Sequence, residues 1–306
     1  MKLNLKMLLL AVLLSCGVSL NAAQDIRIYT ADNSDGKMTA ETIGKVFKEA
    51  GFHVSGNNNM NKVFDMKFKT HTHDAYHLMM LHKRSAVAAL INKYPKIALF
   101  TPLSMSIYIK KGEKTISVSS MDIAGISKIT GIPIDNAILV AYMQEVADTL
   151  VKALPNGKFE NVNYKIAKVE TGLINNFSMS MDVKDEEIED EMDALQEEVE
   201  AGLETSGFVM AGFNSIGDDS YDFFDVYSIC KIAVIFEVSK THPEAGAFAP
   251  CSFYMYKKKG EKKVHLAYPS VHNWFSSIDV VDTASREVLI KAEKAMNAAI
   301  KEATEE

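Results

Sequence analysis

Residues 94–115, YPKIALFTPLSMSIYIKKGEKT, are repeated without a gap as residues 242–263, HPEAGAFAPCSFYMYKKKGEKK. The offset is constant at 242 − 94 = 148, and 10 of the 22 aligned positions are identical. A period of this length is too long for a solenoid repeat, whose unit has about 20–50 residues, and it matches a whole small domain. The sequence therefore predicts the same domain twice in one chain.

The repeat divides the chain into a first copy, residues 25–157, and a second copy, residues 158–306. A further match, GFHVSGNNN (51–59) with GFVMAGFNS (207–215), has an offset of 207 − 51 = 156. The first copy therefore carries 156 − 148 = 8 extra residues between about Met60 and His73. We expect a surface loop or rim there.

Each copy is expected to follow the order β-α-β-β-β-β-α. Met105, Ile107 and Ile109 alternate with polar neighbours, which predicts a strand with one buried face. The shared Lys-Gly-Glu-Lys run predicts a hairpin turn after that strand in both copies. The predicted fold class is α+β, with two homologous domains that each form a largely antiparallel sheet backed by helices.

The first residues predict export. Two lysines precede an apolar run from Met7 to Leu14, as in a secretory signal peptide of residues 1–22. That run is too short to span a bilayer permanently, so no transmembrane helix is expected. Two outcomes stay open: cleavage after Ala22 would release the chain into the periplasm, whereas Cys16, in a lipoprotein-like LLSC box, would anchor it to the envelope by a lipid.

Charge is spread unevenly along the chain. The net charge of −7 opposes a nucleic-acid partner, which would require a basic surface. Between Asp185 and Asp225 there are fifteen carboxylates and no Lys or Arg. Apolar residues recur at steps of three and four from Ile188 to Leu203, which predicts a helix with its acidic face in solvent. A docking surface for a basic partner is the alternative for that face.

Residues 228–269, SICKIAVIFEVSKTHPEAGAFAPCSFYMYKKKGEKKVHLAYP, resemble the core of the bacterial domain of unknown function numbered 302. The shared features are a cysteine that ends a strand, an amphipathic helix, an apolar run closing in Pro-Cys, and a strand hairpin. The interval between Cys230 and Cys251 also matches that of the family. Both copies resemble the family, so the likeness covers most of residues 25–300.

The resemblance implies a fold similar to the saddle of the TATA-box-binding protein. Single-domain members of the family pair as homodimers, so a tandem copy would resemble such a dimer fused into one chain, a pseudo-dimer. The family has no established activity, and the resemblance therefore implies an architecture and no reaction. Cys230 aligns with His82 and Cys251 with Leu103, so the first copy lacks both thiols.

Cys230 and Cys251 form the first candidate site. They would lie at a strand end and a strand start, within reach of a disulfide on neighbouring strands. A structural disulfide, two inert buried thiols, and a redox-active or metal-binding pair all stay open. No Cys-x-x-Cys motif at a helix start marks a lowered thiol pKa.

The second candidate is a histidine cluster in the first copy, formed by His71, His73, His77 and His82. With the neighbouring methionines it offers imidazole and thioether ligands, which would suit a transition metal such as copper. A solvated polar loop is the alternative. The aspartates between Asp218 and Asp225 could hold calcium, although their spacing is not that of an EF-hand loop.

No enzyme motif is found in the sequence, which lacks a nucleophile elbow, a phosphate-binding glycine loop and a His-Glu-x-x-His motif. The first hypothesis is therefore an exported, non-catalytic protein that holds a small ligand or an envelope protein between its two domains, without a cofactor. The alternative is a periplasmic thiol-redox or metal-binding protein that uses Cys230 and Cys251.

Overall fold

The computed structural model describes residues 24–162, 164 and 172–305. The predicted signal peptide and Cys16 lie outside the described residues. The first half of the chain contains β1 (Ile26–Asp32), α1 (Ala40–Glu49), β2 (His53–Asn59), α2 (Met60–Phe68), β3 (His73–His82), α3 (Arg84–Ile91), η1 (Pro95–Phe100), β4 (Leu103–Lys110), β5 (Thr115–Met121), α4 (Ile123–Thr130), α5 (Ala137–Ala153) and β6 (Lys158–Phe159). The second half contains β7 (Ile174–Ser180), η2 (Asp185–Glu187), α6 (Ile188–Thr205), β8 (Val209–Ser215), β9 (Tyr221–Cys230), α7 (Ile232–Ser239), η3 (Pro243–Phe248), β10 (Cys251–Lys258), β11 (Lys263–Pro269), α8 (His272–Ile278) and α9 (Thr283–Glu302).

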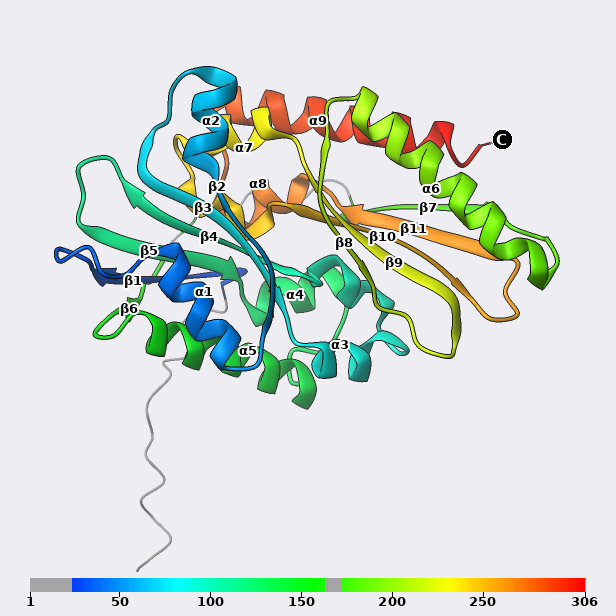
Figure 1. Cartoon of the computed structure of the whole chain (residues 1–306), viewed down its shortest axis with the longest axis horizontal. Coiled ribbons are helices and arrows are strands. Elements are labelled where there is room, and N and C mark those ends of the chain that lie inside the picture. Colours follow the sequence, from blue (N-terminus) through cyan, green and yellow to red (C-terminus); the bar gives the residue numbers. More distant parts are fainter. Residues whose placement is uncertain (1–23, 163, 165–171, 306) are drawn as a thin grey trace, which may run out of the picture.

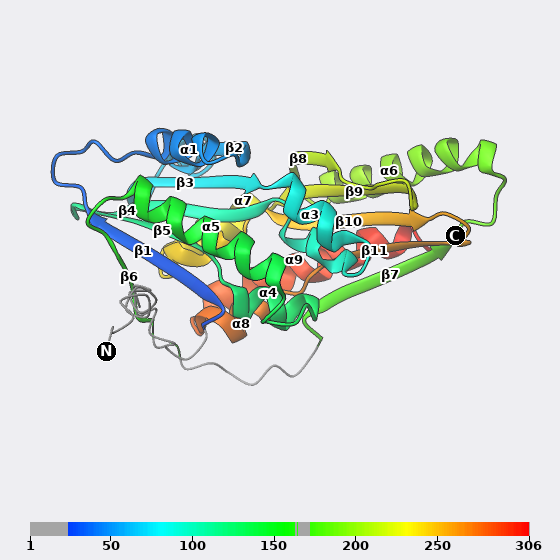
Figure 2. The same cartoon turned by 90° about the horizontal axis from the view of Figure 1, so that it is seen from below.

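The strands form two antiparallel sheets, which follow one another along the long axis of the molecule (Figure 2). The first sheet has the order β2-β3-β4-β5-β1-β6 and the second has the order β8-β9-β10-β11-β7. Strand for strand the two orders correspond, except that β6 is an addition to the first sheet. Because β6 pairs with β1, the first sheet extends two residues past the predicted boundary after residue 157.

The repeated segment occupies the same elements in both halves. The first residues of η1, β4 and β5 are 95, 103 and 115, and those of η3, β10 and β11 are 243, 251 and 263, so the constant offset of the sequence repeat is kept. Gly112 and Gly260 turn the hairpins with φ of 75° and 77°, a backbone conformation that glycine adopts without strain. The predicted hairpins and α+β fold are confirmed.

Paired helices back each sheet. α1 packs with α5, and α6 with α9, toward opposite ends of the molecule (Figure 1). α1 begins at a capping box formed by Thr39 and Thr42, and Gly51 follows its end with φ of 84°. In α6 the predicted apolar stripe is buried, namely Ile188, Met192, Leu195, Val199 and Leu203. None of the helices in the described residues is long and apolar enough to cross a membrane.

The halves are in direct contact through their repeated segments. η3 lies against β4 and β5, while η1 lies against β10 and β11. β4 is therefore buried on both faces from Leu103 to Tyr108, and the prediction of one buried face is wrong. The face expected to meet solvent instead meets the other half: Ser104 Oγ donates to the Pro250 carbonyl at 3.0 Å and Ser119 Oγ, on β5, to the Glu244 carbonyl at 2.7 Å.

The eight-residue insertion falls in a helix, α2, so of the expected surface loop or rim the loop is wrong. The second half has no counterpart, because β8 leads into β9 without a helix between them. α2 lies beside α7 (Figure 1). Phe64 and Phe68 of α2 pack on Phe236 of α7, with ring centroids 5.1 and 4.2 Å from that of Phe236, respectively. The insertion thus adds a contact between the halves.

Candidate ligand-binding groove

A groove of about 390 Å³ lies between the two halves. From the first half, β2, α2 and β3 line it, and from the second, β8, the end of β9, the start of α7 and the residue before β10. Its lining residues are Asn58, Asn59, Met60, Lys62, Val63, Leu78, Val209, Ala211, Cys230, Ile232 and Pro250.

Local sequence shapes the groove. Asn59 caps α2, because its side chain accepts a hydrogen bond from the Lys62 backbone N–H at 3.1 Å, and the chain therefore turns from β2 directly into the helix. Gly56 on β2 leaves room for Met80, since a Cβ at this glycine would lie 2.5 Å from the Met80 Cε. The same Met80 Cε is 4.0 Å from the Cβ position of Gly212 on β8. The edge strands of the two sheets thus approach each other beside the groove.

The groove combines an apolar wall with few polar groups. Met60, Val63 and Leu78 face it from the first half, and Val209 and Ile232 from the second. Its cation is Lys62, which is exposed and forms no ion pair with any residue that the structure describes. The amide of Asn58 adds a hydrogen-bonding group. Such a lining suits an apolar molecule with one anionic end.

The two cysteines lie on neighbouring strands as predicted, and both are free thiols. Cys230 ends β9, and Cys251 begins β10 opposite Ile229. Burial raises the pKa of each thiol to about 12, and the neighbouring Cys251 adds to the effect at Cys230. The Cys251 thiol donates to the Phe248 carbonyl at 3.2 Å. At neutral pH both thiols are protonated, a state that is neither nucleophilic nor metal-binding.

Both cysteines also line a small, partly open pocket of about 50 Å³ in the second half. The pocket is mainly apolar, with Trp274 and Met296 on its wall. Its carboxylate, Glu293, is held in place, since it accepts from the Asn175 side-chain amide at 2.7 Å and from the Val271 backbone N–H at 3.0 Å. This volume holds a few water molecules and is well below that of a typical small-molecule site.

The four predicted metal ligands each have a different environment. His71 contacts Asp65 at 2.8 Å, the ring of His73 stacks on Tyr76, and the Nδ1 of His77 is 3.3 Å from the Asn57 Oδ1. His82 is buried, with its ring centroid 5.0 Å from that of His53. Burial lowers the pKa of both His73 and His82 to about 4, so both are neutral at neutral pH. Across the described residues, no group of three or more His, Cys, Asp or Glu side chains could hold a metal ion.

The aspartates considered for calcium also form no metal-binding group among the described residues. Asp218 accepts hydrogen bonds from the Ser220 backbone N–H at 2.9 Å and from the Asn92 side chain at 2.6 Å, and it thereby links the halves. Asp222 pairs with Lys257, and Asp225 accepts from Gln196 at 3.0 Å. These three carboxylates therefore bind other side chains and backbone groups of the protein.

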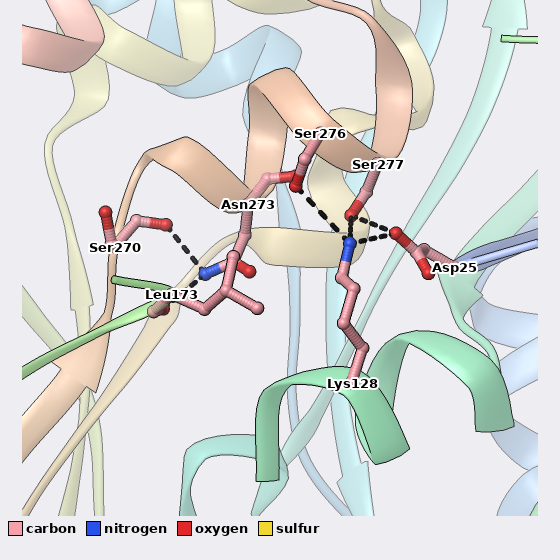
Figure 3. Close-up of polar contacts among 7 residues, drawn as sticks. All are labelled: Asp25, Lys128, Leu173, Ser270, Asn273, Ser276 and Ser277. Atoms are coloured by element: carbon pink, nitrogen blue, oxygen red, sulfur yellow. Dashed lines mark hydrogen bonds and ion pairs between the residues drawn. The ribbon is translucent and has the colours of Figure 1, made fainter. Parts of the chain in front are cut away.

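A polar cluster joins the halves through residues that do not line the groove. The ammonium of Lys128, on α4, reaches Asp25 and donates to Ser276 Oγ at 3.3 Å and Ser277 Oγ at 3.0 Å, both on α8 (Figure 3). Ser277 also donates to Asp25 at 2.7 Å. Lysine can activate serine in some hydrolases, but here Asp25 holds the ammonium in an ion pair and both serines are 2% exposed. The cluster ties the halves together.

The sequence did not identify the groove residues of α2, Met60, Lys62 and Val63. The eight-residue insertion was the available signal, because extra residues in one of two copies mark a place where the copies differ in structure. Lys128 and its serine partners carry no pattern that separates them from other polar residues.

The known proteins that resemble this chain are few and distant. No family model matches the chain, and no curated protein matches it either. Among the solved structures that match is the crystal structure of an uncharacterized conserved protein, DUF302, from Bacillus stearothermophilus. The match covers 42% of this chain and 97% of that chain, at 18% sequence identity and a TM-score of 0.34. A likeness this distant carries no argument about function.

Proposed function

We propose that this protein is an exported, non-catalytic binding protein that holds a small amphipathic molecule in the groove between its two homologous halves, which pack as a fused dimer. The observation that carries the proposal is the groove of about 390 Å³, to which both halves contribute. Ligand sites are commonly found where domains meet.

The fused-dimer arrangement is supported by reciprocal contacts. Each half places its 3-10 helix, η1 or η3, against the central strands of the other half. In a twofold dimer the same patch of each subunit is used in this way. The corresponding strand orders of the two sheets are a second argument for it.

The lining of the groove points to the chemistry of the ligand. Aliphatic side chains from both halves would cover an apolar body, and Lys62 with Asn58 would bind a carboxylate or similar anionic end at the rim. A medium-chain carboxylic acid has this combination. The absence of a sequence motif for catalysis favours binding without turnover.

Titration with decanoate, followed by isothermal titration calorimetry, tests the proposal. Binding should be lost in Ala211→Trp, because the larger side chain would fill the groove from β8. Lys62→Met should weaken binding about tenfold, the effect of losing one charge-assisted hydrogen bond. Decanoate should be recovered chemically unchanged.

Ser178→Trp is the matched control, because Ser178 is exposed on the edge strand β7 and is not among the groove residues. It should bind decanoate as the unmodified protein does. Equal binding by Ala211→Trp would place the ligand elsewhere and exclude the groove as its site.

Export is the part of the proposal that rests on the sequence of residues 1–22 and on Cys16. Mass spectrometry of the chain purified from its own envelope would show either a terminus after Ala22 or a lipid on Cys16. An uncleaved Met1 terminus would exclude both forms of export.

The thiol alternative depends on Cys230 and Cys251 being reactive. Their raised pKa values oppose it, although Cys230 does line the groove. Its test is the reactivity of the two thiols toward DTNB in the folded protein.

A further inference from the structure

The first half contains a second pocket, of about 500 Å³, which shares only Asn59 with the lining of the groove. It lies on the helix-covered face of the first sheet, just beyond the start of α1. Met79 of β3 lies on this face, because its sulfur is 3.6 Å from the Cβ position of Gly44 in α1. His77, two residues before Met79, lies on the same face, and so does Ile107, its partner on β4. The loop before α1 and the β4–β5 hairpin complete the wall.

The second half fills the equivalent space with its own chain. In the register that aligns 51–59 with 207–215, Ala40, the first residue of α1, corresponds to Gln196, whereas α6 already begins at Ile188. α6 is therefore eight residues longer at this end, about 12 Å of helix. In these two turns Ile188, Met192 and Leu195 are buried. The hydrogen bond from Gln196 to Asp225, the counterpart of His77, supports this register.

The second half also carries a buried lysine at this place, where the first half has an apolar residue. Lys257 is 4% exposed and pairs with Asp222. In the register of the long repeat their counterparts are Ile109 and Asp74, and both line the open pocket. The position that carries an ammonium group in one half is thus apolar in the other, while the carboxylate is kept.

The open pocket is lined mainly by negative charges, as expected where a buried lysine is missing. Four carboxylates line it, on Asp35, Glu41, Asp74 and Glu113, against the ammonium of Lys114. Asp35 has an ion-pair partner in Lys37 at 3.0 Å and Asp74 one in Lys111 at 3.6 Å, both at exposed positions. Glu41 and Glu113 form no ion pair with the residues that the structure describes.

A buried polar side chain adds a directed acceptor. His77 lines the pocket and is 8% exposed. Its Nδ1 contacts Asn57, and its Nε2 has no hydrogen-bond partner in the described part of the chain. Burial lowers the pKa of His77, so the ring is neutral and its free nitrogen can accept a hydrogen bond from an N–H group.

We propose that this pocket binds a small aliphatic amine, whose ammonium group takes the place that Lys257 occupies in the second half. The ammonium lies among Asp74, Glu41 and Glu113, and His77 accepts one of its hydrogens. The alkyl chain lies on Ile109 and Ala75, two of the apolar residues of the lining. This site is separate from the groove and requires no ligand there.

The decisive variant is Ile109→Lys, which introduces the lysine of the second half. The new ammonium should pair with Asp74, as Lys257 does with Asp222, and occupy the site from within. Calorimetric titration with n-butylamine and with diaminobutane at low ionic strength should show binding to the unmodified protein and none to this variant. Glu41→Gln combined with Glu113→Gln should weaken binding at least about tenfold.

Glu49→Gln is the matched control, since Glu49 is an exposed carboxylate in the last turn of the same helix. It should bind the amines as the unmodified protein does. Should Ile109→Lys fail to fold, Ala75→Phe fills the pocket with the residue that the second half carries at position 223. Amine binding that survives both pocket changes, or no binding by the unmodified protein at millimolar amine, would overturn the proposal.

The two sites can be tested independently. Ala211→Trp should leave amine binding unchanged, and Ile109→Lys should leave decanoate binding unchanged. Loss of both ligands in either variant would contradict the assignment of two separate sites.

Discussion

At the scale of single residues, burial determines what the two cysteines can do. Cys230 and Cys251 have pKa values raised to about 12 by desolvation. A thiol in an unfolded chain has a pKa of about 8.5. The folded state therefore favours the protonated form, and this contribution to stability is present below about pH 8.5 and is lost as the pH rises through the unfolded-state value toward 12.

We expect both thiols to resist modification in the folded protein. In a chain carrying Cys16→Ser, the reaction with DTNB at neutral pH should be at least about a hundredfold slower than in urea, because the reacting species is the thiolate. The spectrophotometric release of thionitrobenzoate measures both rates. Fast reaction of one equivalent in the folded state would instead support the thiol-redox alternative.

The residue scale also shows what the sequence could not provide. The interval between Cys230 and Cys251 placed them on neighbouring strands correctly, because strand, helix and strand lengths are local properties. The histidine cluster did not form, since closeness in sequence along a strand says nothing about which neighbour each ring contacts. His71 lies before β3 and pairs with Asp65 of α2, a partner on an element that the sequence did not predict.

At the scale of elements, α2 is the largest difference between the halves. It contributes Met60, Lys62 and Val63 to the groove, and it packs on α7 of the other half. The same helix therefore lines the groove and holds the two halves together. An insertion that only extended a loop would do neither.

Removal of one ring from this contact should loosen the two halves. Phe68→Ala should lower the free energy of unfolding by about 2–3 kcal/mol, because Phe68 is half-buried and stacks on Phe236 with centroids 4.2 Å apart. Met66→Ala, in the same helix at a position 70% exposed, should change it by less than about 0.5 kcal/mol. Urea denaturation followed by circular dichroism measures both. Equal effects would show that α2 does not stabilise the assembly.

Element prediction succeeded where a local pattern sets the structure and failed where the other half does. The stripe from Ile188 to Leu203 in α6 and the hairpin glycines follow from helical periodicity and turn chemistry. Alternation assigns the polar face of β4 to solvent, because it cannot distinguish water from a second domain that offers carbonyl acceptors to Ser104 and, on β5, to Ser119.

At the scale of the whole molecule, duplication supplies a control within one chain. The sheets share a strand order, so differences between the halves identify what each half has gained or lost. The second half fills the site with Lys257 and the long helix α6. The first half leaves it open, because it has Ile109 and the short helix α1 in the corresponding places. No property of a single half, taken alone, would have shown this.

The assembly itself depends on the close approach of η3 to the first sheet. A Cβ at Gly246 would collide with the Ser106 side chain and lie 2.6 Å from the Leu78 Cδ2, and both of these belong to the other half. Gly246→Ala should therefore push the halves apart and lower the free energy of unfolding by about 1–3 kcal/mol, the usual cost of overpacking. Because Leu78 lines the groove, the same variant should also weaken decanoate binding.

Gly172→Ala serves as the control, since its Cβ would lie 3.6 Å from the nearest atom, the Ile174 carbonyl oxygen, which is an ordinary contact. Urea denaturation of the two variants separates a steric effect at the interface from the general effect of replacing glycine. The unmodified chain should unfold in a single transition, because halves that share buried residues lose their support together. If Gly246→Ala were as stable as Gly172→Ala and bound decanoate normally, η3 would not be the contact that holds the two sheets in register, and the fused-dimer proposal would lose its main physical support.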